Sequence, residues 1–275
     1  MKNLDKKTIQ SFGDEWTYFD QSGMTNKEAY KIFKNYFSLF PWKKLSKFSK
    51  GFDMGCGSGR WAEFVAPKVG LLNCVEPSVA IKVAKKKLKK FNNIKYYQKT
   101  LSNSGLKKNS QDFGYSLGVL HHVPNTQLAI NSCTSLLKPG APFLIYIYYY
   151  FDNRPSWFKH FWILSDFIRL FVCKLPKFLK FLICDLIAIF IYYPFSKFLF
   201  LIEKCNLNFK NFPLYYYRYR SFYTMRTDSR DRFGTPLEKR FSKKEILKMM
   251  QDSGLEKIRF KNSSPFWTAI GYKKK

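Results

Sequence analysis

Acidic residues are scarce in this chain of 275 residues, which has 19 Asp and Glu against 48 Lys and Arg and a formal net charge of +29. An excess this large indicates an anionic partner, such as a membrane surface, a nucleic acid or an acidic substrate. The hydrophobic share of 46% excludes a disordered chain. At about 150 residues per domain, the length allows one large domain, or one domain with an insertion.

Metal-binding and targeting signals are also missing. The sequence has three histidines, and no two of its six cysteines have Cys-x-x-Cys spacing, which argues against a metal-ligand cluster. A chain of this length needs no disulfides to fold, so we expect reduced thiols and a cytoplasmic protein. The N-terminal segment 1–7 has no apolar signal region behind it. The longest apolar run, 181–195, contains Asp185 and is shorter than the about 20 residues of a transmembrane helix, which argues against membrane insertion.

Strand-like and helix-like segments alternate along much of the chain. Helical apolar spacing, with start and stop residues at the ends, predicts helices over 26–38, 59–68, 78–91, 124–138 and 242–254. Short apolar runs predict strands over 51–54, 71–75, 94–98, 112–117, 142–150, 258–261 and 266–272. The alternation predicts an α/β fold with a doubly wound, mostly parallel sheet. Such sheets bind ligands beyond the carboxyl ends of their strands.

The segment 151–240 interrupts this alternation before the last two predicted strands. Its first part is apolar and helical, with breaks predicted at Pro155, Pro176 and Pro194, and its second part is dense in Tyr and Arg. Three interpretations are open: a helical cap packed on the core, a lid over an apolar substrate, or a membrane-interface surface. The lysines that would flank such a surface are Lys174, Lys177, Lys180 and Lys197.

A glycine-rich turn follows the first predicted strand. Gly55, Gly57 and Gly59 allow the backbone to approach a ligand closely, ahead of a helix N-terminus. The Gly-x-Gly-x-Gly spacing differs from the Gly-x-Gly-x-x-Gly of nicotinamide-dependent dehydrogenases, which argues against that class. Glu76 ends the second predicted strand, 17 residues after Gly59, where a carboxylate can accept hydrogen bonds from both hydroxyls of a ribose. The turn and the carboxylate together predict a cofactor that contains ribose.

At these motifs the chain resembles class I S-adenosylmethionine-dependent methyltransferases. The resemblance is carried by Asp53-x-Gly-Cys-Gly-x-Gly59 and by Val75-Glu76-Pro77, and residues 112–124 resemble the fourth-strand motif of the same superfamily. It covers about residues 50–150 together with the last helix and two strands. Within the superfamily the chain is similar to bacterial small-molecule methyltransferases with an N-terminal Phe12-Gly-x-Glu-Trp16 segment. The resemblance implies a seven-stranded, Rossmann-like sheet whose last strand is antiparallel.

The resemblance also implies S-adenosylmethionine as the cofactor, and it assigns roles by position. The three glycines would hold the methionine part, Asp53 would anchor its amino group, and Glu76 would hold the ribose. Residues 100–102 lack the acid that many members place against adenine, so we expect a hydroxyl or backbone acceptor there. The other positions that the resemblance assigns to the cofactor are Cys56, Pro77, Leu101, Ser102, Gly118 and Val119.

Catalytic and substrate-binding residues are predicted from their chemistry. His121 and His122 follow the fourth strand at the mouth of the expected cleft, and a histidine that titrates near neutrality suits a general base for a hydroxyl acceptor. The alternative for both is packing or positioning. Arginines can bind an anionic substrate bidentately and aromatic side chains can close over a site, with local ion pairs and packing as the alternatives. On these grounds the predicted substrate contacts are Trp16, Tyr223, Arg226 and Arg232.

We therefore predict a methyltransferase that acts on a small molecule, with lipid-linked and glycan intermediates as candidate acceptors and peripheral membrane contact through the insertion. RNA methylation, suggested by the net charge and the lysine-rich segment 85–90, is the alternative, but no RNA-binding module is evident. A non-catalytic S-adenosylmethionine-binding protein is the third reading. Four regions are expected: a helical cap over 1–50, a cofactor-binding core over 51–150, the insertion over 151–240, and a helix and two strands over 241–275 that complete the core.

Overall fold

The computed structural model describes residues 3–205, 209 and 211–275. They form two compact units. The core unit contains the chain up to Gln21, Ala29–Tyr150 and Leu237–Lys275, and the insertion unit contains Ser22–Glu28 and Phe151–Pro236. The insertion unit therefore interrupts the core unit twice in sequence: briefly after the first helix, and at length between the fifth strand and the last helix.

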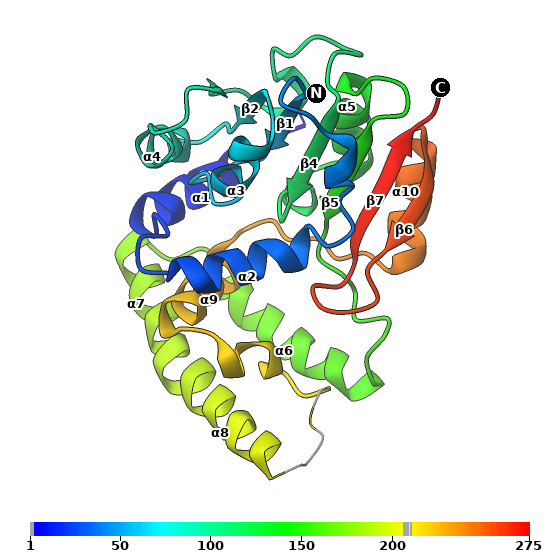
Figure 1. The fold of residues 1–275 in the computed structure, drawn as a ribbon. Coiled ribbons are helices and arrows are strands. Elements are labelled where there is room, and N and C mark those ends of the chain that lie inside the picture. Colours follow the sequence, from blue (N-terminus) through cyan, green and yellow to red (C-terminus); the bar gives the residue numbers. More distant parts are fainter. Residues whose placement is uncertain (1–2, 206–208, 210) are drawn as a thin grey trace. The chain divides into compact units, whose positions relative to one another are not determined.

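The core unit is built on one seven-stranded sheet in the order β3-β2-β1-β4-β5-β7-β6 (Figure 1). Strands β1 to β5 are parallel, and β7 pairs antiparallel with both β5 and β6. This confirms the predicted Rossmann-like fold with an antiparallel last strand. The strands are β1 (Lys50–Met54), β2 (Leu71–Val75), β3 (Ile94–Tyr97), β4 (Phe113–Leu117), β5 (Pro142–Tyr146), β6 (Leu255–Phe260) and β7 (Thr268–Lys273).

Helices cover both faces of this sheet because successive side chains of a strand point to opposite faces. Phe52 and Met54 of β1 join a buried apolar cluster with side chains of α5 and α10. Gly51 and Asp53 face the other side, where a Cβ on Gly51 would come within 2.4 Å of the Phe113 ring. The helices are α1 (Lys6–Tyr18), α2 (Asn26–Tyr36, mostly in the core unit), α3 (Ala62–Val65), α4 (Ala80–Lys87), α5 (Thr126–Leu136) and α10 (Lys243–Asp252).

Several element boundaries differ from the sequence predictions. The predicted helix over 59–68 is reduced to α3 and a 3-10 turn at Ala66–Lys68, where Pro67 has no N–H to continue an α-helix. The predicted strand over 142–150 ends at Tyr146, after which Tyr149 makes only an isolated bridge to Phe241. The predicted capping box at the start of α10 is confirmed: Ser242 and Glu245 each accept from the other's backbone N–H.

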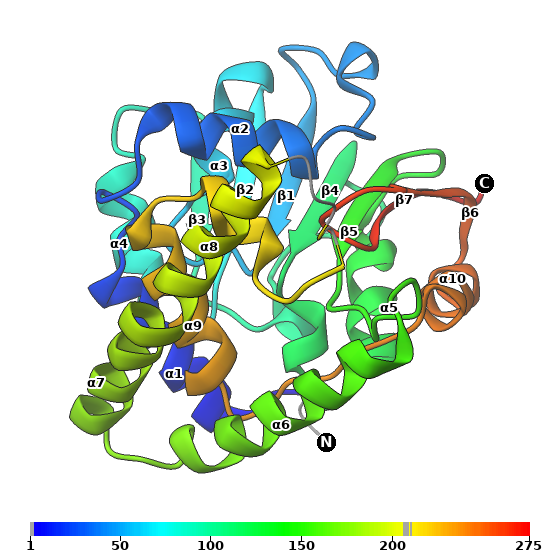
Figure 2. The ribbon, with the colours of Figure 1, turned by 90° about the horizontal axis from the view of Figure 1, so that it is seen from below.

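The insertion unit is helical in the described residues. Its α9 packs against both α6 and α7 (Figure 2), around a small buried cluster that includes Val172, Cys184 and Met225. Ser229 Oγ also donates to the carbonyl of Cys184, at 2.8 Å. The elements are α6 (Ser156–Val172), α7 (Lys177–Ile187), a π-helical turn (Ala188–Tyr192), α8 (Tyr193–Lys204), a 3-10 turn (Tyr215–Tyr219) and α9 (Phe222–Gly234).

The predicted break at Pro194 is wrong. The π-helical turn lets α7 continue into α8, so one helix runs through 28 residues from Lys177 to Lys204. In that turn the N–H of Tyr193 reaches the carbonyl of Ala188, which places Pro194 in the first turn of α8, where its missing N–H costs little. By length and composition alone this helix is long and apolar enough to cross a membrane. The prediction that the chain does not insert into a membrane depended on a short apolar segment, and the structure shows a longer apolar helix. Membrane insertion itself remains untested.

Candidate functional site

The glycine-rich turn lies at the carboxyl end of β1, where hydrogen bonds to the last residue of β2 hold it in place. The N–H groups of Gly55 and Cys56 both donate to the carbonyl of Val75, at 2.8 and 3.1 Å. Gly55, Gly57 and Gly59 have φ of +79°, +52° and +79°, a left-handed conformation that favours glycine. A Cβ on Gly55 would lie 2.5 Å from the Val119 methyl carbons. Both conformation and space therefore require a glycine at this position.

Glu76, directly after β2, connects this turn to the next loop. Its Oε2 accepts from the N–H of Gly57 at 3.1 Å, and its Oε1 accepts from the N–H of Ser78 at 2.9 Å. Its residue is 7% exposed, and burial raises the carboxyl pKa, against the opposing effect of these hydrogen bonds. A carboxylate has about four lone-pair sites. The Ser78 hydroxyl also lowers the Glu76 pKa by hydrogen bonding, so the carboxylate keeps acceptor capacity for a ligand hydroxyl after these contacts.

Asp53 lies on β1, two residues before Gly55, and is buried. Tyr115 of β4 donates its hydroxyl to Asp53 Oδ2 at 3.0 Å, a contact that follows from the register in which these two residues are paired. Burial raises the Asp53 pKa to about 8, with the Tyr115 hydrogen bond lowering it and the nearby Glu76 charge raising it further. Neither Asp53 nor Glu76 forms an ion pair with any described residue. The site therefore concentrates two uncompensated carboxyl groups.

The space beside these carboxyl groups is bounded by α1 and β4. A Cβ on Gly57 would lie 3.2 Å from the indole Nε1 of Trp16, so this predicted side chain lies against the turn. Gly118, with φ of +78°, follows β4, and a Cβ there would meet nothing within 4 Å. The carboxyl end of β4 thus borders open space, where the resemblance places the methionine end of the cofactor.

The remaining predicted cofactor residues have mixed surroundings. Leu101 is buried in the apolar cluster with Met54, while Ser102 is exposed and lies 3.4 Å from the hydroxyl of Thr100. Cys56 is buried within the turn, and Pro77 is partly exposed after Glu76.

His121 and His122 form a 3-10 turn after β4, together with Leu120. His121 is 0% exposed, and its ring lies 3.9 Å from the rings of both His122 and Tyr148, centroid to centroid. Neither of its ring nitrogens has a hydrogen-bond partner among the described residues. Burial lowers its pKa well below the usual range, helped by His122 and Arg240. His121 is therefore neutral at physiological pH, whereas His122 contacts the carbonyl of Leu237 through Nδ1 at 2.6 Å.

The predicted substrate residues other than Trp16 belong to the insertion unit. Arg226 holds Asp185 with two contacts, Nε to Oδ1 at 2.9 Å and Nη2 to Oδ2 at 2.5 Å. Arg232 contacts Asp166 at 3.1 Å. The ring of Tyr223 occupies the place that a Cβ on Gly23 would need. Within their unit these side chains therefore make the local ion pairs and packing contacts that were the alternative interpretation.

Two aromatic residues near the site were not predicted from the sequence. Tyr115 neutralises part of the burial penalty of Asp53, and Tyr148 stacks on His121. Only the strand alternation could have signalled Tyr115: it lies two residues after Phe113, on the face of β4 that matches Asp53 on β1. Nothing in the local sequence signals Tyr148, because it lies beyond the end of β5.

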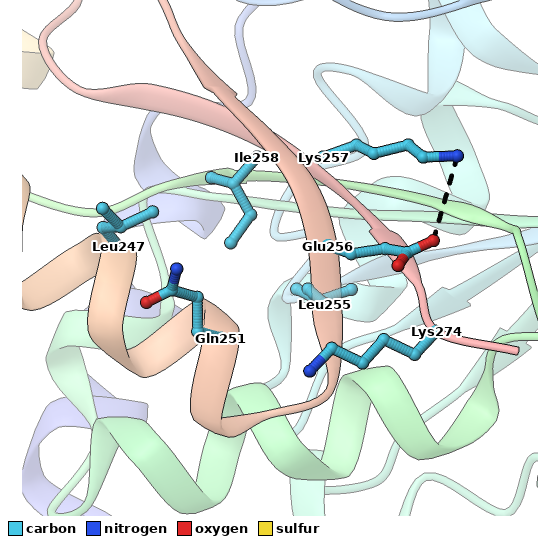
Figure 3. Close-up of a pocket in the computed structure, with 7 residues that line it drawn as sticks. All are labelled: Leu247, Gln251, Leu255, Glu256, Lys257, Ile258 and Lys274. Atoms are coloured by element: carbon cyan, nitrogen blue, oxygen red, sulfur yellow. Dashed lines mark ion pairs between the residues drawn. The ribbon is translucent and has the colours of Figure 1, made fainter.

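A shallow pocket lies elsewhere on the core unit, at the edge strand β6 (Figure 3). Leu247 and Gln251 of α10 line it opposite Ile258, beside the 4.0 Å contact between Lys257 and Glu256. Strands β4, β5 and β7 separate this edge from β1. The pocket is therefore distinct from the glycine-rich turn.

Comparisons with known proteins agree with this geometry. Residues 52–145 match a family model described as a methyltransferase domain, and no curated protein matches the chain. An O-methyltransferase family protein of Burkholderia thailandensis has a TM-score of 0.55 at 12% identity, over 90% of this chain and 56% of that one. The methyltransferase solved in complex with the Haloferax volcanii Trm112 activator gives 0.53 at 11%, over 96% and 98%. Phosphoethanolamine N-methyltransferase 2 of Haemonchus contortus gives 0.51 at 16%, over 94% and 46%. At these identities the likenesses show a shared fold.

Proposed function

We propose that this chain, which carries an S-adenosylmethionine-dependent methyltransferase domain over residues 52–145, methylates a small molecule. The proposed acceptor is a lipid-linked or glycan intermediate. One observation carries the proposal. The described residues leave two buried carboxyl groups without a cationic partner around a turn of three left-handed glycines. A cofactor with a ribose and two positive charges, one on sulfur and one on its amino group, matches that set.

The residues present fit S-adenosylmethionine. Glu76 has free acceptor positions for the ribose hydroxyls, and Asp53 provides a carboxyl group for the amino group. Gly118 borders the open space in which a methionine chain can lie. When bound, the cofactor supplies a methyl group on a sulfonium, which is already an activated electrophile. The chain's own task is then to hold the acceptor in line with that methyl and to exclude water.

We propose His121 and His122 as the groups that act on a hydroxyl acceptor. A neutral imidazole with no other partner can take a proton, and the lowered pKa of His121 keeps it neutral across physiological pH. The same lowered pKa makes it a weak base while it is buried. Its role is therefore expected only once an acceptor reaches the His121–Tyr148 stack, and an amine acceptor would not need it.

The acceptor class is proposed from the insertion unit and from the relatives. The unit exposes many apolar side chains, which suits an acceptor with an apolar part, and one structural relative is named for methylation of a phosphoethanolamine. The alternative of RNA methylation depends on the segment 85–90. Two lysines of that segment, Lys87 and Lys90, pair with Glu63, which favours a solvated helix face. We also propose a cytoplasmic location, supported by six cysteines that are all free.

Cofactor binding and turnover test these proposals separately. Calorimetric titration of the wild-type protein with S-adenosylmethionine and S-adenosylhomocysteine should show micromolar binding. Release of S-adenosylhomocysteine is then followed with a lipid extract, a water-soluble glycan fraction and total RNA as acceptor sources, with Glu76→Ala as the blank. Lipid-dependent release supports the proposed acceptor, and RNA-dependent release replaces it. Absence of cofactor binding by folded protein contradicts the proposed function as a whole.

A further inference from the structure

One side of the continuous helix from Lys177 to Lys204 is apolar and uncovered. Its buried side consists of Cys184, Ala188, Tyr192, Ser196 and Leu199, which recur every three or four residues. The opposite side is exposed along its length, to 75% at Phe178 and 71% at Phe190. The other exposed apolar side chains of this helix are Leu179, Leu182, Leu186, Ile189, Ile191, Tyr193, Phe195, Phe198 and Leu201. A soluble protein rarely leaves an apolar surface of this extent uncovered.

The covered side of the same helix packs on the apolar cluster of the insertion unit and also carries two ion pairs. Asp185 is held by Arg226 of α9, and Glu203 is held by Arg218 with its Nε at 2.6 Å from Oε2. Ion pairs and arginine-rich segments are costly in hydrocarbon. Because this side packs on α9 and on the 3-10 turn at Tyr215–Tyr219, the helix cannot be surrounded by lipid on all sides in this fold. The geometry favours contact with lipid through one side only.

The charges around the apolar side are of one sign. Asp185 and Glu203 are the only acids between Lys177 and Lys204, and both are occupied by arginines. Basic residues stand at the two ends: Lys174, Lys177 and Lys180 before and within the first turns, and Lys197 and Lys204 near the other end. Long basic side chains at the ends of an apolar face can reach lipid headgroups while the face is inserted.

Helix α6 adds a second uncovered apolar side to the unit. Phe161, Leu164, Phe167 and Phe171 are all about 60% exposed, at the spacing of one helix face. Its acid, Asp166, is again occupied by arginine, through Arg169 Nε at 2.7 Å and Arg232. The pattern seen on the long helix is thus repeated on an independent element of the same unit.

We propose that the insertion unit binds the surface of an anionic lipid bilayer through the uncovered side of the Lys177–Lys204 helix. The helix lies in the interface, with Phe178 and Phe190 among the acyl chains and the terminal lysines at the phosphate groups. The proposal is independent of the proposed function, because it concerns only the location of the protein. If both hold, the same surface brings the enzyme to lipid-linked acceptors.

Vesicle flotation of the full chain tests this proposal. Vesicles of phosphatidylcholine with about 30 mol% phosphatidylglycerol should bind the wild type at least about tenfold more tightly than phosphatidylcholine alone, and added salt should reduce the difference. The variant Phe178→Ser/Leu182→Ser/Phe190→Ser should weaken binding by more than about tenfold. Lys174→Gln/Lys204→Gln should remove part of the preference for anionic lipid and leave binding to neutral vesicles unchanged.

A matched control tests whether vesicle binding depends on this helix face or on any exposed apolar side chain. Phe48 is 92% exposed on the core unit, so Phe48→Ser should bind vesicles like the wild type. Melting temperature and S-adenosylmethionine affinity, measured on every variant, show that each is folded and that cofactor binding is unaffected. Unchanged vesicle binding by the triple variant, or none by the wild type, overturns the proposal.

Two other occupants of the face would be recognised in the same experiments. A wild-type dimer in analytical ultracentrifugation that the triple variant dissolves, without vesicle binding, would assign the face to a second copy of the chain. Resistance of the bound wild type to extraction at alkaline pH would indicate a helix that crosses the bilayer. Either result contradicts the interfacial proposal.

Discussion

The acids at the glycine-rich turn differ from those that link the helices of the insertion unit. In the insertion unit Asp166, Asp185 and Glu203 are each held by arginine. In the core unit Asp53 and Glu76 are more deeply buried, yet their partners are the hydroxyls of Tyr115 and Ser78 and backbone N–H groups. A buried carboxyl group without a cation costs free energy unless it is protonated or a cationic ligand binds. The contrast indicates that arginine pairs link the helices of the insertion unit, whereas Asp53 and Glu76 are left for a ligand even though other acids of the core unit, such as Glu238, have cationic partners.

Removing Glu76 should have the largest effect on ligand binding. In Glu76→Ala the turn loses the acceptor of the Gly57 N–H, and the ribose loses its carboxylate. Hydrogen bonds to a charged group contribute about 1.5–3 kcal/mol each, so S-adenosylmethionine affinity should fall by about 100-fold or more in calorimetry. Glu63→Ala, which removes an acid paired with Lys87 and Lys90, is the matched control and should bind like the wild type. A loss below about threefold in Glu76→Ala would contradict the ribose assignment.

Asp53→Asn should separate stability from binding. The folded-state pKa of Asp53 is raised to about 8 from 3.8, so the folded protein keeps a proton that the unfolded chain releases. This carboxyl group therefore reduces stability progressively as pH rises from about 4 to 8, with no further loss above 8. Asparagine is neutral and can still accept from Tyr115. The melting temperature of Asp53→Asn should exceed that of the wild type at pH 8, and the gap should close towards pH 4.

The same variant should bind the cofactor less tightly. A cation favours the ionised form of Asp53, so wild-type affinity should increase relative to Asp53→Asn as pH rises to about 8. Comparing the two proteins at each pH removes the contribution of the cofactor's own amino group. We expect an advantage of about tenfold for the wild type at pH 8. A ratio that does not change between pH 6 and 8 would show that Asp53 stays out of contact with the bound cation.

The sequence predicted the residues of the cofactor site better than it predicted the arginine pairs of the insertion unit. Gly55, Gly57, Gly59 and Glu76 are within 22 positions of one another, so local spacing was enough to place them around one turn. The contact of Tyr115 with Asp53 spans 62 positions and depends on strand register. That pairing is a tertiary property, which a motif cannot show.

The arginines and the long helix were missed for a similar reason. Arg226 and Arg232 were predicted to bind substrate, but their acids lie 41 and 66 positions away, so the sequence could not show that they were occupied. Pro194 was taken as the end of a helix because proline normally ends one. The π-helical turn that accommodates it has no local sequence signature. The fold class, by contrast, followed from the alternation of helices and strands and from the resemblance, which cover the core unit.

Breaking the Arg226–Asp185 ion pair should destabilise the insertion unit and leave the cofactor site intact. In Arg226→Gln, Asp185 loses two contacts at a position that is about three-quarters buried. Unpaired, partly buried acids typically cost about 1–2 kcal/mol. The insertion unit should therefore become more susceptible to limited proteolysis between residues 173 and 221, while S-adenosylmethionine affinity stays within about twofold of the wild type. Arg226→Gln/Asp185→Asn, which removes both charges, should recover much of the loss. A large drop in cofactor affinity would show that Arg226 does more than hold Asp185.

Gly118→Ala should give the smallest effect, and it tests how open the site is. Alanine at a φ of +78° is strained by about 1 kcal/mol, but its methyl group would meet nothing within 4 Å. The melting temperature should therefore fall by only a few degrees. If the methionine end of the cofactor occupies this space, S-adenosylmethionine affinity should fall by about threefold to tenfold in calorimetry, because the added methyl group narrows the space.

Gly140→Ala is the matched control. Gly140 has the same φ of +78° and an equally open Cβ position, but it follows α5 on the loop before β5. It should show the same loss of melting temperature with no change in affinity. Equal affinities for the two variants would mean that the space beside Gly118 lies outside the cofactor's path, and would leave the acceptor as its occupant.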